Sequence, residues 1–191
     1  AVISCFSPLF SLSFRHFYDK VGSGAAGYAA KRRRIQSSLQ KTVFLRHNAR
    51  KGRNSALNIQ MGGIDYNQAS IEYRELFSLT QSHAFHTAQE LKEQCGCDGV
   101  VVLSTCNRTE LWLSGTCQRD PLETFCTLRR APYAEYRNLF THRTGLAAAQ
   151  YLFSLACGIQ SQIFGEDQIL TQVKNALSLA REAHCTDSVL E

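Results

Sequence analysis

The sequence lacks the features that define several large classes of protein. No hydrophobic run is long enough to span a bilayer, because the apolar opening from Ala1 to Phe14 is short and interrupted. No C-x-x-C motif occurs, and Cys95 and Cys97 are separated by one residue instead of the two of common zinc knuckles. We therefore expect no membrane association and no metal site.

A fingerprint for dinucleotide binding is also missing. The one G-x-G-x-x-G spacing, from Gly22 to Gly27, has no strand or helix pattern around it, and we interpret it as a linker of small residues. A secretory signal of the expected form is absent as well. The eight cysteines are therefore interpreted as reduced thiols of a cytoplasmic protein and not as four disulfides.

Acidic residues are scarce in the first quarter of the chain. Residues 1–55 hold eleven of the 21 Lys and Arg but only one of the 16 acidic residues, so this segment carries +10 and leaves −5 for the rest. We interpret it as a basic tail that is disordered or lies upstream of the native start. Its Arg-rich and Ser-rich composition also resembles an organellar transit peptide or a nucleic-acid arm. The remaining chain has no bulk charge that favours RNA, so RNA contact would need a local patch.

The apolar patterns from residue 57 onwards predict an α+β fold. Alternation at Leu57, Ile59 and Met61 indicates a first strand, and helical spacing indicates a helix from Ser82 that Gly96 ends. The other elements expected here are a short helix at 71–77, strands at 99–103 and 109–114, and a helix from Pro121. This order predicts a small antiparallel β-α-β-β sheet with helices on one face, over about residues 56–130.

Beyond about Tyr133 the pattern predicts helix throughout, so a helical part is expected over about residues 133–191. One apolar stripe ends at Gly158, and another runs from Asp167 to Ala183. Between them, residues 158–166 form a loop that leads to the start of a long helix, where a polar or anionic group is readily held. An ordinary connection between two helices fits the same spacing.

A single cysteine stands between two of the predicted strands. Cys106 follows the apolar run Val100 to Leu103, and Arg108 lies two positions beyond it. Because only the thiolate is strongly nucleophilic, a nearby guanidinium would lower the pKa of this thiol and activate it. From these residues alone, a cysteine without a function beside a surface arginine is the better interpretation.

Longer motifs change that interpretation. The run S-T-C-N-R-T-E-L at residues 104–111 resembles a segment of the glutamyl-tRNA reductases, and residues 158–174 are similar to the family pattern G-L-D-S-x-x-L-G-E-x-Q-I-L-x-Q-V-K. A weaker similarity at residues 63–75 resembles the start of the catalytic domain, with departures at Tyr66, Gln68 and Ser70. The resemblance covers about residues 57–191 and concerns the N-terminal catalytic domain of the family.

The resemblance implies a specific chemistry. In this family a cysteine thiolate attacks the ester of glutamyl-tRNA, and NADPH reduces the resulting thioester to glutamate-1-semialdehyde for tetrapyrrole (porphyrin) biosynthesis. Carried over, Cys106 is the catalytic nucleophile, and Arg108 is suited to hold a carboxylate through two hydrogen bonds. The residues implied in substrate binding are Thr105, Asn107, Arg108, Ser161, Glu166, Asp167, Gln168 and Gln172.

Two departures from the family are expected to matter. Tyr151 occupies the position of the family's catalytic histidine, and a phenol with an ordinary pKa of about 10 cannot relay protons at neutral pH. His142 is a poor substitute, because it lies more than two helical turns earlier if the helix is continuous. The chain also stops about where the family continues into a nicotinamide-binding domain and a dimerising helix. We therefore expect NADPH to bind to a domain absent from this chain.

The resemblance also implies partners and leaves other functions open. The partners are glutamyl-tRNA, the next enzyme of the pathway, an aminomutase, and a second copy in full-length homodimers. Without hydride, water would discharge the thioester, and the chain would act as a glutamyl-tRNA esterase. Alternatively, it is a non-catalytic tRNA- or partner-binding remnant that has lost the histidine and the cofactor domain.

Overall fold

A computed structural model of the chain describes residues 57–160 and 168–191. Its elements are β1 (Ile59–Asp65), α3 (Ile71–Phe77), α4 (Gln81–Cys95), β2 (Gly99–Thr105), β3 (Arg108–Ser114), α5 (Pro121–Leu128), α6 (Tyr133–Tyr136), the 3-10 turn η1 (Arg137–Leu139), β4 (Thr141–Thr144), α7 (Gly145–Ala156) and α8 (Gln168–Glu182). The strands form one sheet in the order β2-β3-β1-β4, and every neighbouring pair is antiparallel. The predicted α+β class is confirmed, and the short helix expected at residues 71–77 is α3.

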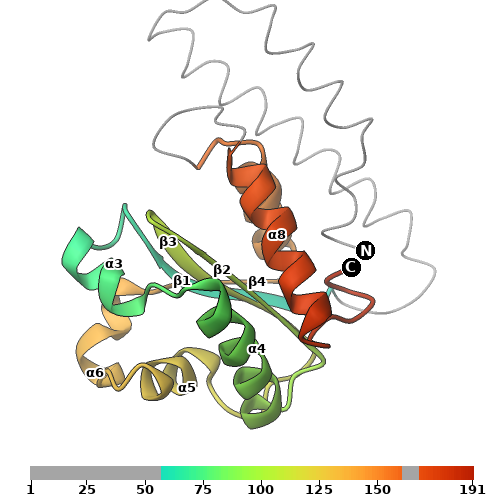
Figure 1. Cartoon of the computed structure of the whole chain (residues 1–191), viewed down its shortest axis with the longest axis horizontal. Helices are drawn as coiled ribbons and strands as arrows, with labels where there is room; N and C mark the ends of the chain where they lie inside the picture. Colours follow the sequence, from blue (N-terminus) through green and yellow to red (C-terminus); the bar gives the residue numbers. More distant parts are fainter. Residues whose placement is uncertain (1–56, 161–167) are drawn as a thin grey trace, which may run out of the picture.

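Helices cover both faces of this sheet: α4 and α5 of the predicted sheet part lie on one face, and helices of the later, helical part cover the other. Leu111 and Trp112 are neighbours on β3 and point to opposite faces, yet each is only 1% exposed. On one face Leu122 of α5 packs against Gly62, and on the other Tyr151 of α7 stacks on Trp112. Figure 1 shows α4 and α5 on one side of the strands and α8 on the other. Continuous apolar runs such as Val100 to Leu103 are typical of strands buried on both faces.

The fourth strand was not predicted, because its sequence Thr-His-Arg-Thr carries no apolar pattern. β4 lies in the part of the chain expected to be helical throughout, and it pairs with β1 from Gly63 opposite Thr141 to Gln60 opposite Thr144. Its residues alternate between half-buried and exposed, as in a short edge strand. The sheet and the later helices share one hydrophobic core, which includes Met61 and Leu152.

Glycines end two of the predicted helices. Gly96 follows α4 with φ +65°, and Gly158 follows α7 with φ +68°. After α7 the N–H of Gly158 donates to the carbonyl of Leu155 at 2.8 Å, and that of Ile159 donates to the carbonyl of Ser154 at 3.0 Å. These two bonds form a Schellman motif, which satisfies the last carbonyls of the helix. The prediction that glycines end these helices is confirmed.

The C-terminal segment covers the outer edge of β2. The backbone N–H of Val100 donates to the carbonyl of Cys185 at 2.7 Å. Leu190 is fully buried and lies close to Gly99. Within the ranges 57–160 and 168–191, no helix combines the length and the apolar character needed to cross a bilayer.

Candidate active site

Cys106 lies at the tip of the β2–β3 hairpin. Thr105 and Arg108 are paired across the two strands, so that Cys106 and Asn107 alone form the turn. The N–H of Asn107 donates to Oγ1 of Thr105 at 3.2 Å, and its carbonyl accepts from the N–H of Tyr66 at 3.0 Å. The Cys106 side chain is exposed and its thiol is free. The hairpin therefore presents an accessible sulfur on a backbone that is fixed on both sides.

Arg108 is buried beneath this tip and is not the surface arginine that the simpler interpretation assumed. Its side chain is 2% exposed, and Nη1 forms an ion pair with Oε1 of Glu110 at 3.0 Å. Nη1 also donates to the hydroxyl of Tyr151 at 2.9 Å, and Nη2 donates to the carbonyl of Gln160 at 2.5 Å. Burial is the largest single effect and lowers the pKa of the guanidinium, but Glu110, Tyr151 and Asp65 together outweigh it, so the pKa is raised.

Glu110 is the centre of this buried network. It is 1% exposed, and its Oε1 also accepts from the hydroxyl of Tyr151 at 2.7 Å, while Oε2 accepts from Nε1 of Trp112 at 3.2 Å. The three residues 108, 110 and 112 alternate along β3, so they share the face that α7 covers. The carboxylate is thus surrounded by three donors, as a buried charge requires.

Tyr151 of α7 is a neutral donor in this network. Burial raises the pKa of its phenol well above the ordinary range, and the neighbouring Glu110 adds to this effect. The guanidinium of Arg143, on β4, lies 4.4 Å from the centre of its ring. The hydroxyl of Tyr151 is therefore held in its protonated form between the carboxylate of Glu110 and the guanidinium of Arg108.

The two motifs that carry the family resemblance meet at the carbonyl of Gln160. This carbonyl accepts from Nη2 of Arg108 and from the hydroxyl of Tyr66, the latter at 3.4 Å. The segment that begins at Gly158 is therefore attached to the base of the Cys106 turn. Residues 52 positions apart in sequence are brought into direct contact at this point.

The remaining predicted substrate residues lie on or before α8. Gln168 is exposed at the first position of the helix. Gln172 is half-buried and lines a groove of about 430 Å³ between α8, β2 and the start of α4, together with Ser104. Ser161, Glu166 and Asp167 lie outside the described residues.

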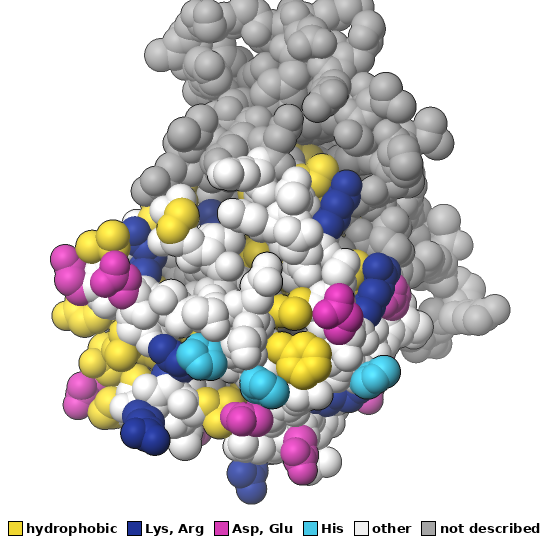
Figure 2. All heavy atoms as spheres, in the orientation of Figure 1, with side chains coloured by type: hydrophobic (Ala, Val, Ile, Leu, Met, Phe, Trp, Pro, Cys, Tyr) yellow, Lys and Arg dark blue, Asp and Glu magenta, His cyan; other side chains and the backbone are white. Residues whose placement is uncertain are grey.

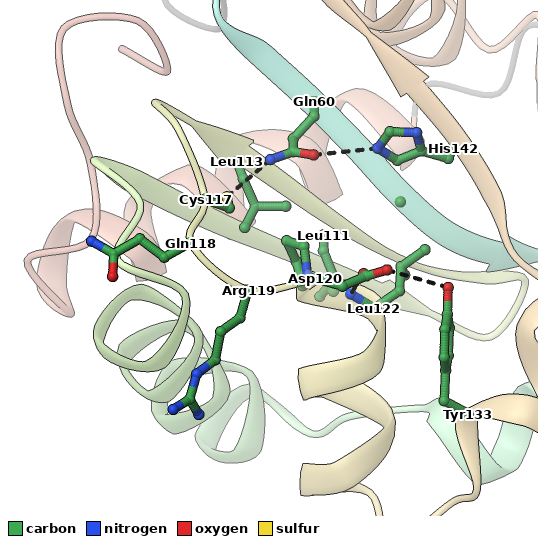
Figure 3. Close-up of a pocket in the computed structure, with 12 residues that line it drawn as sticks. Gln60, Leu111, Leu113, Cys117, Gln118, Arg119, Asp120, Leu122, Tyr133 and His142 are labelled. Atoms are coloured by element: carbon green, nitrogen blue, oxygen red, sulfur yellow. Dashed lines mark hydrogen bonds between the residues drawn. The ribbon is translucent and has the colours of Figure 1, made fainter.

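His142 faces the opposite side of the sheet from Tyr151. Its neighbour Arg143 lies over the Tyr151 ring, and consecutive strand residues point in opposite directions. His142 instead lies with Nε2 3.3 Å from Oε1 of Gln60, at the edge of a separate cavity of about 540 Å³ (Figure 3). It is not placed to act in place of the family's histidine.

Sequence reasoning missed Glu110, Trp112 and the Gln160 carbonyl as parts of the site. A signal was present, because Arg108 and Glu110 are alternate charged residues that lead directly into the apolar run Leu111 to Leu113. Charges at such positions face inward and need each other as partners. The sequence therefore contained a signal for the pairing of Arg108 with Glu110. It contained no signal that Tyr151 would contact both of them.

The described residues offer no metal site, and their surface mixes charges of both signs. No group of three or more His, Cys, Asp and Glu side chains is arranged to hold a metal within residues 57–160 and 168–191. On the face in Figure 2, Lys and Arg side chains are interspersed with Asp and Glu.

Comparisons with known proteins agree on one family. Residues 63–191 match the family model described as "Glutamyl-tRNAGlu reductase, N-terminal domain". Proteins named glutamyl-tRNA reductase from Acetivibrio thermocellus and Alkaliphilus oremlandii are 46% and 40% identical to this chain over 139 residues, which is 71% of this chain and 41% of each relative. The solved glutamyl-tRNA reductase from Methanopyrus kandleri superposes with a TM-score of 0.56 at 26% identity, over 70% of this chain and 31% of that one. The chain thus spans less than half the length of these relatives.

Proposed function

Because this chain belongs to the glutamyl-tRNA reductase family and matches the family's N-terminal domain, we propose that it captures glutamate from glutamyl-tRNA as a thioester on Cys106. One observation carries the proposal. The exposed thiol lies at the tip of a hairpin whose base, at Arg108, is bonded to Gln160 at the start of the second family motif.

The proposed step is an acyl transfer. The Cys106 thiol gives up its proton, and the thiolate attacks the carbonyl carbon of the ester that joins glutamate to the tRNA 3′ end. A C–S bond forms, the ester C–O bond breaks, and the ribose oxygen leaves with a proton as free tRNA. The thioester stores the glutamyl group in a form more electrophilic than an oxygen ester.

Arg108 is proposed to hold the carboxylate of the glutamyl group. A guanidinium has five N–H donors, and contacts with the described residues use three of those of Arg108. The two donors that make no contact with the described residues are proposed to meet a substrate carboxylate at the base of the Cys106 turn. Glu110 and Tyr151 keep the guanidinium in place while it does so.

The other predicted residues complete the proposed pocket. Thr105 and Asn107 flank Cys106 in the sequence of the turn, and Gln168 and Gln172 are proposed to contribute from α8. Ser161, Glu166 and Asp167, outside the described residues, belong to the second family motif, and Glu166 is proposed to bind the α-amino group of the substrate. The two glutamines offer amide donors and acceptors to its polar atoms.

Reduction of the thioester is assigned to a nicotinamide-binding domain and not to the residues described here. The hydride donor implied by the family is NADPH, and dinucleotides are typically held at the edge of a parallel β-α-β sheet. Every pair of neighbouring strands among the described residues is antiparallel, so these residues do not fit that cofactor. This domain on its own is expected to form the thioester without producing glutamate-1-semialdehyde.

The test is to trap the acyl-enzyme. The chain is incubated with tRNA charged with labelled glutamate, quenched in acid and mapped by mass spectrometry. We expect a glutamyl adduct on Cys106 that hydroxylamine releases, and no adduct in Cys106→Ser. The matched control is Cys117→Ser, which removes another accessible thiol and should keep the adduct.

Three outcomes separate the alternatives. An adduct on Cys106 supports the proposal, whereas free glutamate released continuously without NADPH would identify an esterase. Binding of glutamyl-tRNA with no adduct, unchanged in Cys106→Ser, would overturn the proposal and leave a binding module. Because Cys106 is exposed, the substitution should change the free energy of unfolding by no more than about 0.5 kcal/mol.

A further inference from the structure

A groove lies along β2 beside the turn that carries Cys106. Its volume is about 430 Å³, and its walls come from the start of α4, from β2 and from α8. β2 is the outer strand of the sheet, and α4 and α8 lie on opposite sides of it (Figure 1). Ser104 lines the groove and precedes Cys106 by two residues, so their Cα atoms are at most about 7 Å apart. The groove therefore begins next to the proposed nucleophile.

Hydrogen bonds of Ser104 fix the wall nearest to Cys106. Its Oγ accepts from the N–H of Leu79 at 2.9 Å and lies 3.1 Å from Oγ1 of Thr109. The first bond attaches the segment before α4 to β2, and the second joins β2 to β3. Thr80 then caps α4, with its Oγ1 accepting from the N–H of His83 at 3.3 Å. The start of α4 is thus held in a defined position against the hairpin.

The opposite wall is one stripe of α8. Gln172, Asn175 and Leu179 are spaced by three and four residues, so they share a face of the helix. The neighbouring stripe, with Ile169 and Val173, is buried in the core. Asn175 is exposed and Gln172 is half-buried. α8 therefore presents amide groups to the groove and apolar groups to the core.

The lining is almost uncharged and rich in hydrogen-bonding groups. Six of the described residues that line the groove carry a hydroxyl or an amide, namely Thr80, Gln81, Ser104, Gln172, Asn175 and Ser178. Among the described residues of the lining, Glu182 alone is charged, and it lies at the C-terminal end of α8. Hydroxyls and amides offer both donors and acceptors, whereas phosphates are typically bound by Lys and Arg. The groove is therefore suited to an uncharged ligand with several polar edges.

We propose that this groove binds the terminal nucleoside of the tRNA that carries the glutamyl ester. This assignment rests on the proposed acyl transfer, in which the ester carbonyl lies at the Cys106 sulfur and the attached ribose and base lie directly beside the turn. Ribose and base are uncharged, and the base has polar edges and apolar faces. Leu79 and Leu179 offer those faces an apolar side chain from each wall. The volume of the groove is within the range of about 300–1,000 Å³ that is typical of small-ligand sites.

The larger cavity of about 540 Å³ is less well placed for this nucleoside. Gln60 and His142 line it, together with the connection from β3 to α5. Among its described lining residues, none belongs to β2 or to the Cys106 turn. A nucleoside in that cavity would lie away from the ester that Cys106 attacks.

The first test compares two compounds that bring the same glutamyl group to Cys106. One is glutamyl-tRNA, and the other is the α-thiobenzyl ester of glutamate, which has no nucleoside. Asn175→Phe and Gln81→Phe place a ring in the groove from its two walls, at exposed positions. Both variants should lower the rate of adduct formation from glutamyl-tRNA by about tenfold or more, because contacts to the base are lost. The rate from the thioester should not change.

Ser82→Phe is the matched control. Ser82 is the exposed neighbour of Gln81 and is not among the residues that line the groove. This variant should leave both rates unchanged, and urea denaturation of all three variants checks that the fold is kept. An equal loss of rate with both compounds in Asn175→Phe and Gln81→Phe would contradict the proposal, because the effect would then concern the glutamyl group or the nucleophile.

The second test measures binding without any chemistry. Deacylated tRNA, and the same tRNA shortened by its terminal nucleotide, are titrated at one fixed salt concentration against the Cys106→Ser chain with and without Asn175→Phe. Without Asn175→Phe, shortening the tRNA should raise Kd by about tenfold. With Asn175→Phe, shortening should have no further effect, because the two changes remove the same contact.

The two tests separate this assignment from the proposed reaction. If neither compound acylates Cys106, the proposed acyl transfer is wrong, and the binding comparison still decides whether the groove holds the terminal nucleoside. If acylation occurs but shortening the tRNA leaves Kd unchanged in the Cys106→Ser chain, the acyl transfer stands and the assignment of the groove is overturned.

Discussion

At the scale of single residues, Tyr151 decides the character of the candidate site. An imidazole at this position would exchange protons near neutral pH, whereas the buried phenol stays protonated and donates to Glu110. It also accepts from Arg108, so it fixes the two charged groups relative to each other. In the proposed reaction its role would be to position the guanidinium, and the proton for the leaving tRNA would come from another group or from water.

Removal of this hydroxyl should destabilise the protein. Tyr151→Phe keeps the ring against Trp112 but leaves Glu110 and Arg108 each without one partner. We expect a loss of about 1–3 kcal/mol in the free energy of unfolding, measured by urea denaturation at neutral pH. Tyr133→Phe is the matched control, because its hydroxyl contacts Asp120 at 3.4 Å in an exposed setting. Equal stability of Tyr151→Phe and the parent would show that the hydroxyl contributes nothing.

The same hydroxyl predicts a dependence on pH. The pKa of Tyr151 is raised on folding by burial and by Glu110, so the unfolded chain loses this proton first. The stabilisation is complete below about pH 10, the ordinary pKa of tyrosine, and decreases above it by about 1.4 kcal/mol per pH unit. Urea midpoints of the parent and Tyr151→Phe should therefore converge between pH 9.5 and pH 11. A constant difference over that range would contradict the buried, protonated phenol.

At the scale of elements, β1 is shaped by the side chains that pack on each of its faces. Gly63 lies opposite Glu110 in the strand register. A Cβ at Gly63 would come within 2.6 Å of the carbonyl oxygen of Thr109 and 2.8 Å of Cα of Glu110. A Cβ at Gly62 would meet only the side chain of Leu122, at 2.9 Å. Glycine at position 63 thus allows β1 to lie close to the backbone of β3 at Thr109 and Glu110. Glycine at position 62 leaves room for Leu122 of α5.

Alanine at these two positions should have different effects. Gly63→Ala should cost about 3 kcal/mol, because a backbone carbonyl cannot rotate away as a side chain can, and Gly62→Ala should cost about 1 kcal/mol. Thermal or urea unfolding of the two variants measures the difference. If Gly62→Ala proved the more destabilising, close approach of β1 to β3 would not be what selects glycine here.

Element by element, the sequence patterns located most of the sheet and helices but not their layers. The expected strands at 99–103 and 109–114 are β2 and β3, and the helix expected from Ser82 is α4. β4 was missed because its pairing with β1 is a property of the sheet and leaves no trace in a four-residue polar sequence. The helices of the sheet part lie on one face as predicted, but the sequence did not show that the later helices would cover the other face, although the unbroken apolar run in β2 indicated burial on both sides.

At the scale of the whole molecule, the C-terminal segment completes the core beside the hairpin. Leu190 is fully buried, and Cys185 pairs through its carbonyl with Val100 on the outer strand. The last residues therefore cover an edge of the sheet that would otherwise expose unpaired backbone groups. The hairpin that presents Cys106 depends on this cover for its rigidity.

Truncation of the buried leucine tests that dependence. Leu190→Ala should lower the free energy of unfolding by about 2–4 kcal/mol through the cavity that it leaves. Leu76→Ala is the control, since Leu76 is 36% exposed and should cost less than about 1 kcal/mol. Urea denaturation measures both changes, and faster amide exchange of β2 in Leu190→Ala would locate the effect. An unchanged stability would show that the C-terminal segment is dispensable.

The expected aminomutase partner, the homodimer and the boundary of the basic N-terminal tail stay predictions at this scale. The family assignment concerns residues 63–191, and the shared core joins the sheet to α7 and α8 in one body. The conversion of glutamyl-tRNA to an aldehyde stays a proposal, in which this domain would supply the nucleophile.

The sequence by itself determined the local features: a cysteine in a tight turn between two strands, helices ended by glycine, and the motifs that identify the family. These follow from patterns within a few residues, which constrain the backbone directly. Only the tertiary structure decided which side chains meet. It joined Arg108 and Glu110 to Tyr151 and Gln160, and it placed His142 on the opposite face. Such contacts depend on how strands and helices align in space, since buried charges and thiols take their properties from neighbours that are distant in the chain.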